Sequence, residues 1–176
     1  DVFINLISEN ANVKKEDILG WEFFVYSRDK GRLIGKNSEY ILAPRIDDLQ
    51  CVFGTLKGFL QSENSNSARV YCVFDNEEVG SATKQGASST FLRDVLTRIC
   101  ESMGHNTSDY IKKLHSSFMV SADNGHVIHP NHPEKNDPVN KPKMNGGILI
   151  KHNANQKYTT DSISWAIFKS ICHEAG

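Results

Sequence analysis

An unbroken apolar stretch at residues 70–74, within a strand predicted over 69–74, limits the folds open to this chain. Unbroken apolar strands are typical of sheets that are covered on both faces. A helix pattern follows, with apolar residues on one face at Phe91, Leu92, Val95, Leu96 and Ile99. A strand, a loop and a helix in this order form the repeating unit of parallel sheets.

The other segments extend this alternation. Helices are predicted at the start of the chain, from Pro44 through apolar positions up to Leu60, and behind Asp161, which is a favourable N-terminal cap. Further strands are predicted over residues 18–26, 39–42, 118–122 and 147–152, with a turn at 29–31 and a long loop over 124–145. We therefore expect an α/β fold with a mostly parallel sheet flanked by helices, and ligands at the carboxyl ends of the strands.

Charge and composition argue against some classes of binding partner. The chain carries 20 Lys+Arg against 21 Asp+Glu, and its longest basic run is the pair Lys14-Lys15. This balance gives no electrostatic case for a nucleic-acid or membrane-surface partner. No apolar run approaches the roughly 20 residues that a membrane helix needs. We expect a soluble protein with a peptide or small-molecule ligand.

The cysteines indicate the cellular compartment, and the two ends of the chain indicate whether it is part of a longer protein. Four cysteines lie far apart without a Cys-x-x-Cys pair, at Cys51, Cys72, Cys100 and Cys172. We interpret them as reduced core residues and expect a cytoplasmic location. The chain begins with Asp1 inside a helical pattern and ends at Gly176, which is typical of a helix cap before a further element. We expect it to be part of a longer protein.

Acidic residues stand where the predicted strands end. Glu77 and Glu78 follow the strand over 69–74, Asp123 follows the strand over 118–122, and Asp47 lies near the start of a helix. Carboxylate oxygens placed in this way can converge on a two-metal site whose ions lie about 3.5–4 Å apart. Spacing alone favours a plainer interpretation, a solvated acidic loop with two helix-capping aspartates.

Four ordered blocks resemble the M18 family of metallo-aminopeptidases, the aspartyl aminopeptidases. They are PRIDDL at 44–49, FDNEEVGS at 74–81 with QGA at 85–87, SAD at 121–123 with HPN at 129–131, and IKHN at 150–153 with QKY at 156–158. The first forty residues are similar in outline only. The chain departs from the family pattern at Asn124-Gly125, where a bulkier pair is common, and at Asp48, where Asn is common. Neither departure is expected to touch a metal ligand.

The resemblance implies a site for two zinc ions, with other divalent metals as alternatives. Asp47 would bridge both ions, Glu78 would bind one and Asp123 the other. Glu77, which is adjacent to a ligand and not itself one, would act as general base on the water held between the ions. The family takes one histidine ligand from an upstream segment and one from a downstream segment, both outside this chain. We therefore expect the chain alone to be inactive.

The resemblance also assigns substrate contacts to His126, Lys151 and Tyr158. An imidazole or phenol can donate a hydrogen bond to a developing oxyanion, and the Lys151 ammonium can bind a substrate carboxylate. The plainer alternative for Lys151 is that it caps a strand end or pairs with Asp161.

Three histidines recur at every third residue, at His126, His129 and His132. Pro130 and Pro133 interrupt the repeat, so no helix aligns the rings and no histidine metal site is predicted.

The predicted domains follow from the same resemblance. Residues 1–38 would be the C-terminal part of an inserted dimerisation domain, and residues 39–176 the central part of the metallopeptidase catalytic domain. The expected reaction is hydrolytic release of N-terminal residues, acidic ones above all, from peptides by a homodimer or a dodecamer. The alternatives are a non-catalytic peptide-binding or assembly protein on the same fold, and a related binuclear hydrolase that removes N-acyl groups.

Overall fold

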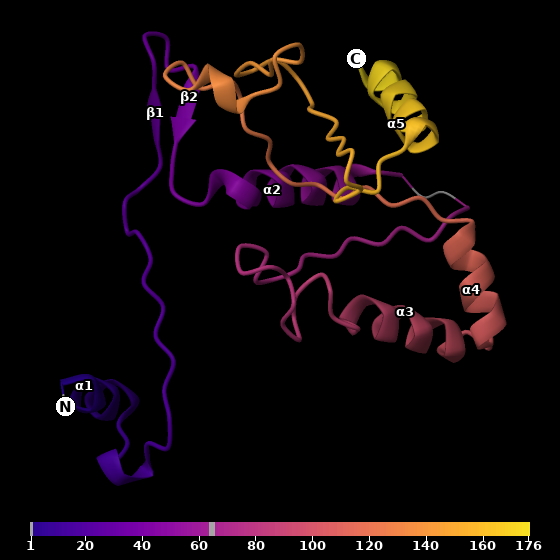
Figure 1. Cartoon of the computed structure of the whole chain (residues 1–176). Helices are drawn as coiled ribbons and strands as arrows, with labels where there is room; N and C mark the ends of the chain where they lie inside the picture. The colour runs from indigo at the N-terminus through magenta and orange to yellow at the C-terminus, as the bar shows by residue number, and fades with distance from the viewer. Residues whose placement is uncertain (1, 64–65) are drawn as a thin grey trace. The chain divides into compact units, whose positions relative to one another are not determined.

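The computed structural model describes residues 2–63 and 66–176, which fall into two compact units, Asp1–Arg45 and Ile46–Gly176. Figure 1 labels their helices and strands in chain order. Over the residues described, we find no helix with the length and apolar character needed to cross a membrane.

The first unit consists of α1 (Val2–Ala11), η1 (Lys15–Asp17), β1 (Arg32–Ile34) and β2 (Tyr40–Leu42). The predicted first helix and the extended segment at 39–42 are confirmed. β1 and β2 pair antiparallel, with Leu33 opposite Ile41. The turn between them begins at Gly35, whose φ of 96° is a conformation that favours glycine.

Two predictions in this unit are wrong. Residues 18–26 form no strand, and the turn lies at 35–39 rather than at 29–31. In residues 18–26, Phe23 instead contacts α1, since its ring lies 5.3 Å from that of Phe3, while Leu19 and Val25 stay almost fully exposed. A strand pattern needs a hydrogen-bonding partner to become a strand, and within the described residues β1 pairs with β2 alone.

The second unit consists of α2 (Ile46–Gln61), α3 (Phe91–Ser102), α4 (Thr107–His115), η2 (Pro133–Lys135) and α5 (Ser162–Ala175). The predicted helices after Pro44, at 91–99 and behind Asp161 are confirmed as α2, α3 and α5. The Asp161 side chain accepts a hydrogen bond from Ser164 N and so caps α5 as predicted.

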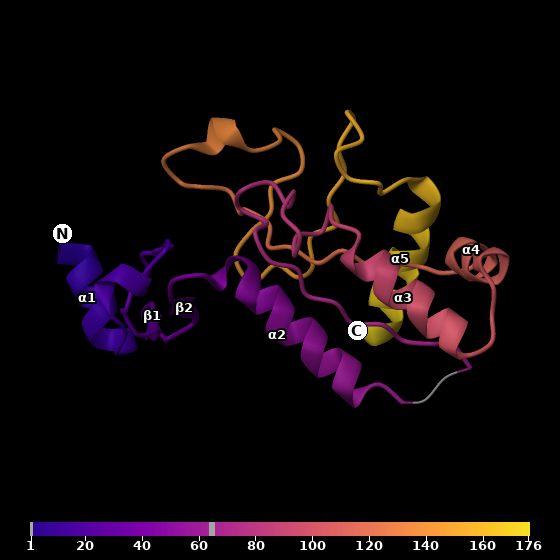
Figure 2. The same cartoon turned by 90° about the horizontal axis from the view of Figure 1, so that it is seen from below.

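α4 is not among the predicted helices. A capping box starts it, in which the Asn106 side chain accepts from Asp109 N and the Asp109 side chain accepts from Asn106 N. α4 packs on α3, and Figure 2 shows it beginning beside the end of that helix. Among the described residues, Tyr110 of α4 is the one apolar side chain that is buried, at 8% exposure.

The mostly parallel sheet is not formed by the described residues, whose one sheet is the antiparallel β1–β2 pair. The predicted strands at 69–74, 118–122 and 147–152 carry no strand pairing. The first of them lies along α2, because Tyr71 Oη donates to Val52 O at 2.8 Å. A parallel strand is stable when strands flank it and helices cover both faces, and here Val70 and Met119 remain 57% and 76% exposed.

The predicted domain boundary at 38/39 stays a prediction. The division into compact units falls between Arg45 and Ile46, so β2 belongs to the same unit as β1. The four cysteines are free and half-buried.

Candidate metal and peptidase site

The entry to α2 presents two adjacent carboxylates. Asp47 has an extended backbone (φ −82°, ψ 112°) inside the first turn of the helix, and the Asp47–Asp48 peptide bond is cis. Arg45, just before them, has a positive φ of 61°. The backbone at Asp47 is thus non-helical one residue after α2 begins.

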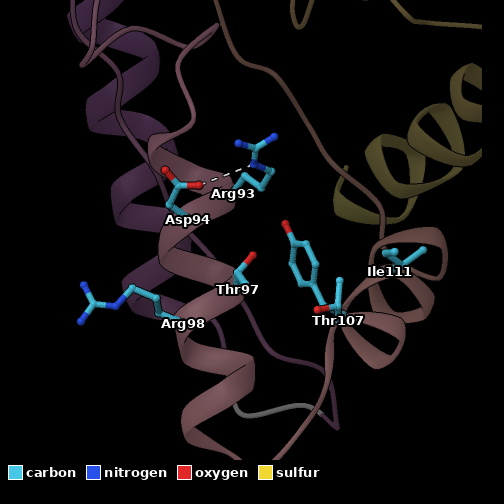
Figure 3. A pocket seen from close by; sticks show the side chains of 7 residues that line it. Arg93, Asp94, Thr97, Arg98, Thr107 and Ile111 are labelled. Carbon is cyan, nitrogen blue, oxygen red and sulfur yellow. Dashed lines mark ion pairs between the residues drawn. The ribbon is translucent and has the colours of Figure 1, made fainter.

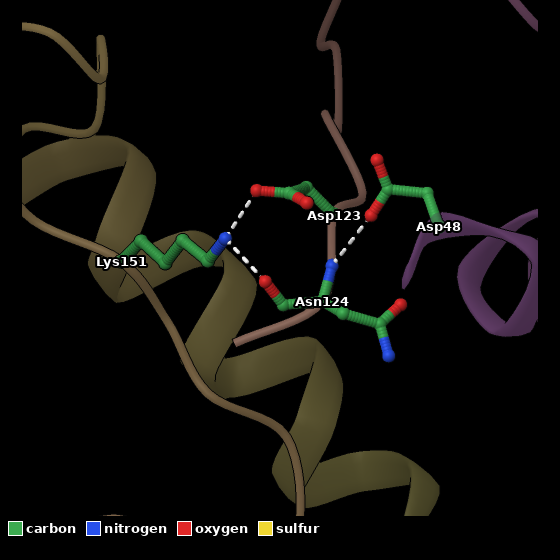
Figure 4. A network of polar contacts seen from close by, with 4 residues as sticks. All are labelled: Asp48, Asp123, Asn124 and Lys151. Carbon is green, nitrogen blue, oxygen red and sulfur yellow. Dashed lines mark hydrogen bonds and ion pairs between the residues drawn. The ribbon is translucent and has the colours of Figure 1, made fainter. Parts of the chain in front are cut away.

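A third carboxylate, Asp123, comes from the end of the extended segment at 118–122. Asp48 Oδ1 accepts a hydrogen bond from the backbone N–H of Asn124 at 2.9 Å, as Figure 4 shows. The Asn124 side chain donates to Gln50 Oε1 at 3.1 Å. These two bonds tie the segment of Asp123 to the first turn of α2.

Carboxylate oxygens of Asp47, Asp48 and Asp123 lie within 4.8 Å of one another; we call these three residues the acidic cluster. Asp47 and Asp123 are exposed and Asp48 is half-buried. The structure thus brings together two of the three predicted metal ligands, from positions that are 76 residues apart in the chain. Like charges at this separation repel, and a cation among them removes the repulsion.

Asp48 is the residue of the cluster that the sequence analysis missed. The departure from the family pattern at this position was the available signal, and the expectation that it touches no predicted ligand stays a prediction. Asp48 is a chain neighbour of Asp47, and its carboxylate is grouped with that of Asp123.

Glu77 and Glu78 lie on a loop with a defined backbone. Gly80 N donates to Glu77 O at 2.8 Å, Ser81 N donates to Asn76 O at 2.9 Å, and Asp75 N donates to Gln85 O at 3.0 Å. Gly86 is buried against the loop, because a Cβ on it would lie 2.1 Å from Ser81 O. The loop is therefore held by backbone contacts that allow no side chain at position 86.

Both glutamates are exposed, and neither belongs to the acidic cluster as the described residues form it. The negative charges of the acidic cluster still affect the pKa of Glu77. The pKa of its carboxyl is raised above the ordinary value, first by partial loss of hydration and then by the negative charges of Glu78 and of the acidic cluster. A raised pKa favours the protonated form, which suits a group that accepts and returns a proton.

Lys151 approaches Asp123 from the side opposite Asp48, as Figure 4 shows. Its Nζ forms an ion pair with Asp123 Oδ2 and donates to Asn124 O at 2.7 Å (Figure 4). Partial burial lowers the pKa of Lys151, but the hydrogen bond to Asp123 and its charge outweigh this effect, so the pKa is raised. Lys151 therefore stays charged. The alternative of a pair with Asp161 is wrong, since Asp161 caps α5.

The other predicted substrate residues lie near this pair or in the long loop. Tyr158 is 41% exposed, and the Lys151 Nζ lies 5.9 Å from the centre of its ring. His126 is exposed. Farther along, the rings of His129 and His132 lie 5.4 Å apart, and His132 Nδ1 lies 3.1 Å from Glu134 Oε1.

A hollow of about 480 Å³ opens between α3 and α4, away from every predicted site residue. Figure 3 shows Arg93, Asp94 and Thr97 of α3 on one side of it and Ile111 of α4 on the other. Arg93 is already paired with Asp94 at 3.5 Å. The hollow holds no group of carboxylates, so we place the candidate site at the acidic cluster.

The acidic cluster fits a divalent cation. Oxygens that bind one zinc ion at about 2.0–2.2 Å lie roughly 3–4 Å apart, which is within the 4.8 Å limit of the cluster. Asn124 Oδ1, beside the cluster, is buried and has no hydrogen-bond partner among the described residues. Oxygen donors alone suit hard cations, whereas zinc prefers a set that includes nitrogen or sulfur.

Comparison with known proteins identifies the class to which this chain belongs. All of residues 1–176 match the family described as Aminopeptidase I zinc metalloprotease (M18). The chain belongs to the M18 family of zinc metallopeptidases.

Relatives of known name agree with this assignment. The chain is 42% identical over 173 residues to the probable M18 family aminopeptidase 2 of Clostridium acetobutylicum, covering 98% of this chain and 40% of the relative. It is 34% identical over 179 residues to the aspartyl aminopeptidase of Caenorhabditis elegans, covering 98% and 38%. The chain thus spans about two fifths of the length of these relatives.

Solved structures of similar proteins share the fold. The chain superposes on Chaetomium thermophilum mApe1 with a TM-score of 0.78 at 30% identity, covering 99% of this chain and 40% of that one. A chain in the cryo-EM structure of the Ape4 and Nbr1 complex gives a TM-score of 0.78 at 35% identity, covering 98% and 35%. The chain therefore shares the fold of the matching part of these proteins.

Proposed function

We propose that the full-length protein is a binuclear zinc aminopeptidase that releases N-terminal residues, acidic ones above all, from peptides. The observation that carries the proposal is the convergence of Asp47 and Asp123 in one acidic cluster, in a chain of a zinc metallopeptidase family. The aspartyl aminopeptidase name of a relative supports the acidic preference.

In this proposal the zinc ions would be held by Asp47, shared between the two, with Asp123 on one ion and Glu78 on the other. When bound, the zinc ions supply Lewis-acid chemistry and lower the pKa of water toward neutrality. Glu78 is exposed, and the proposal requires its side chain to turn toward the acidic cluster. The mostly parallel sheet, with strands at 69–74 and 118–122, belongs to the same proposal, since it would bring the ends of both strands to one edge.

Glu77 is the proposed general base. Its carboxylate takes a proton from the attacking water and returns it to the leaving amine. Since Glu77 and Glu78 are adjacent, one loop would supply both the base and a ligand.

Lys151, Tyr158 and His126 are the proposed substrate contacts. The Lys151 ammonium, now paired with Asp123, would exchange that carboxylate for the side-chain carboxylate of an N-terminal Asp or Glu. Tyr158, next to Lys151, and His126 carry donors for the oxyanion that develops on the peptide carbonyl.

The wider setting is part of the proposal too: peptide substrates, a homodimer or dodecamer, a cytoplasmic location, and residues 1–38 as the end of a dimerisation domain. The non-catalytic alternative keeps the fold and binds peptides without cleaving them. The acylase alternative keeps the metals and changes the bond that is cleaved.

One experiment separates these functions. The full-length protein is incubated with an Asp-terminated peptide, its Leu-terminated analogue and its N-acetylated analogue, before and after removal of metal with a chelator. We expect cleavage of the free Asp-terminated peptide that stops on chelation and returns with zinc. Cleavage of the N-acyl bond alone would favour the acylase, and binding without cleavage would favour the non-catalytic protein.

A further inference from the structure

The hydrogen bond between Asp48 and Asn124 joins the two segments that carry the proposed metal ligands. Asp48 Oδ1 accepts from the Asn124 N–H at 2.9 Å, in partly buried surroundings, across 76 residues of sequence (Figure 4). Hydrogen bonds from a backbone N–H to an ionised carboxylate are roughly twice as strong as those between neutral groups.

The two residues that this hydrogen bond joins are each next to a proposed metal ligand in the chain. Asp47 directly precedes the acceptor residue, and Asp123 directly precedes the donor residue. The bond therefore limits how far apart the backbones of Asp47 and Asp123 can move. Their carboxylate oxygens lie in the one acidic cluster found among the described residues.

We propose that Asp48 is a positioning residue, which holds Asp123 opposite Asp47 for zinc binding by accepting the Asn124 N–H. The inference rests on the proposed function. Asp48 acts through the backbone of Asn124 and needs no contact with the metal or the substrate.

A second contact to the same residue provides a matched control. Gln50, on the same turn of α2, accepts from the Asn124 side chain at 3.1 Å. That bond holds the amide group of Asn124 and not the backbone next to Asp123. If positioning works through the backbone, loss of Asp48 weakens zinc binding and loss of Gln50 does not.

The test uses the full-length protein and zinc alone as the probe. Zinc affinity is measured in chelator-buffered solutions, with zinc content per chain determined by mass spectrometry, for D48A, D48N, D48E and Q50A. We expect D48A to weaken zinc binding by about 10- to 100-fold, the usual effect of losing a group that orients a ligand. D48N, which keeps the acceptor oxygen without the charge, should bind zinc more tightly than D48A, because the Asn124 N–H keeps an acceptor in a weaker, neutral bond.

D48E separates geometry from charge, because it keeps the carboxylate and displaces the acceptor by one methylene. We expect it to bind zinc less tightly than D48N. Thermal unfolding of each variant in excess chelator measures the stability of the fold without metal. If D48A does not fold, the zinc affinities of D48E and D48N still test the positioning role.

Wild-type zinc affinity in D48A or D48E would overturn the positioning role and leave the proposed function standing. D48N as weak as D48A would assign the effect to charge and also overturn it. A wild-type protein that binds no zinc would overturn the proposed function itself, so the two failures are distinct.

Discussion

The ammonium of Lys151 and the carboxylate of Asp123 form an ion pair between segments that lie 28 residues apart. The same Nζ donates to Asn124 O at 2.7 Å and lies 5.9 Å from the centre of the Tyr158 ring. The side chain of Lys151 is 25% exposed, so its charge is only partly hydrated. The proposed contact of Lys151 with a substrate carboxylate rests on this partly hydrated charge.

Lys151→Met should therefore reduce activity on acidic substrates selectively. Loss of one partner from a desolvated charge pair typically costs about 2–5 kcal/mol, so kcat/KM for an Asp-terminated peptide should fall by about 30-fold or more. The value for the Leu-terminated analogue should hardly change. Both are measured on the full-length protein.

The matched control is Lys157→Met, which removes a lysine from the same segment and should leave both values unchanged. An equal fall on the two substrates would remove Lys151 from the specificity pocket. A higher kcat/KM of the wild-type protein for the Leu-terminated peptide would contradict the proposed preference for acidic residues.

Glu77→Gln in the full-length protein should keep its zinc and lose turnover. The amide cannot accept the proton, so kcat should fall by about 10²- to 10⁴-fold, the usual share of general acid–base catalysis. The control is Glu78→Gln, which should lose zinc as well as activity. Normal turnover in Glu77→Gln would show that the roles are wrongly assigned.

The 176-residue chain by itself should bind zinc weakly and cleave no peptide. Its donors are carboxylates, and oxygen donors alone are a poor set for zinc. Its apolar side chains remain exposed, including Phe24 at 76% and Ile148 at 74%, so it should also lack a cooperative unfolding transition. Calorimetric zinc titration and thermal circular dichroism, with the full-length protein as reference, check both points. Tight stoichiometric zinc binding by the chain alone would contradict this prediction.

Gly86→Ala should disrupt the loop that carries Glu77 and Glu78. A Cβ there would lie 2.1 Å from Ser81 O and 2.5 Å from its carbonyl carbon, and backbone atoms cannot rotate away as a side chain can. We expect a loss of about 1–3 kcal/mol in the free energy of unfolding of the full-length protein, together with a lower kcat. Gly54→Ala is the control, because no atom lies within 4 Å of its Cβ position. Equal stability of the two variants would show that the loop can move.

The α5 cap should respond to acid. Hydrogen bonds from the Ser164 hydroxyl and backbone lower the pKa of Asp161 below its ordinary value. The stabilisation is therefore complete above the unfolded pKa of about 3.9 and is lost as the pH falls through the lower folded value. The protection factors of the α5 amides against hydrogen exchange in the full-length protein should fall in this window. Asp161→Asn keeps a capping side chain and should remove that pH dependence; an unchanged profile would show that Asp161 does not cause it.

The helices and their caps were predictable because their causes are local. The apolar spacing of Phe91, Leu92 and Val95 lies within one turn of α3, and Asp161 caps α5 through a residue three positions away. α4 has an equally local signal, the capping box of Asn106 and Asp109, and could have been found by the same reasoning.

Sheet formation was less predictable, because an apolar segment becomes a strand only beside a partner. Residues 69–74 have the pattern of a buried strand, yet among the described residues Tyr71 contacts α2 rather than another strand. An apolar pattern indicates that a segment is suited to burial. The rest of the fold decides which strand or helix it packs against.

At the site, the sequence by itself indicated the residues on which the proposed chemistry rests: Asp47, Asp123 and the Glu77-Glu78 pair. Tertiary structure alone decided that Asp48 accepts from Asn124 and that Lys151 pairs with Asp123. These contacts join residues 76 and 28 positions apart. Contacts at such separations depend on how the elements pack in space, because local spacing governs only the neighbours within a turn or a strand.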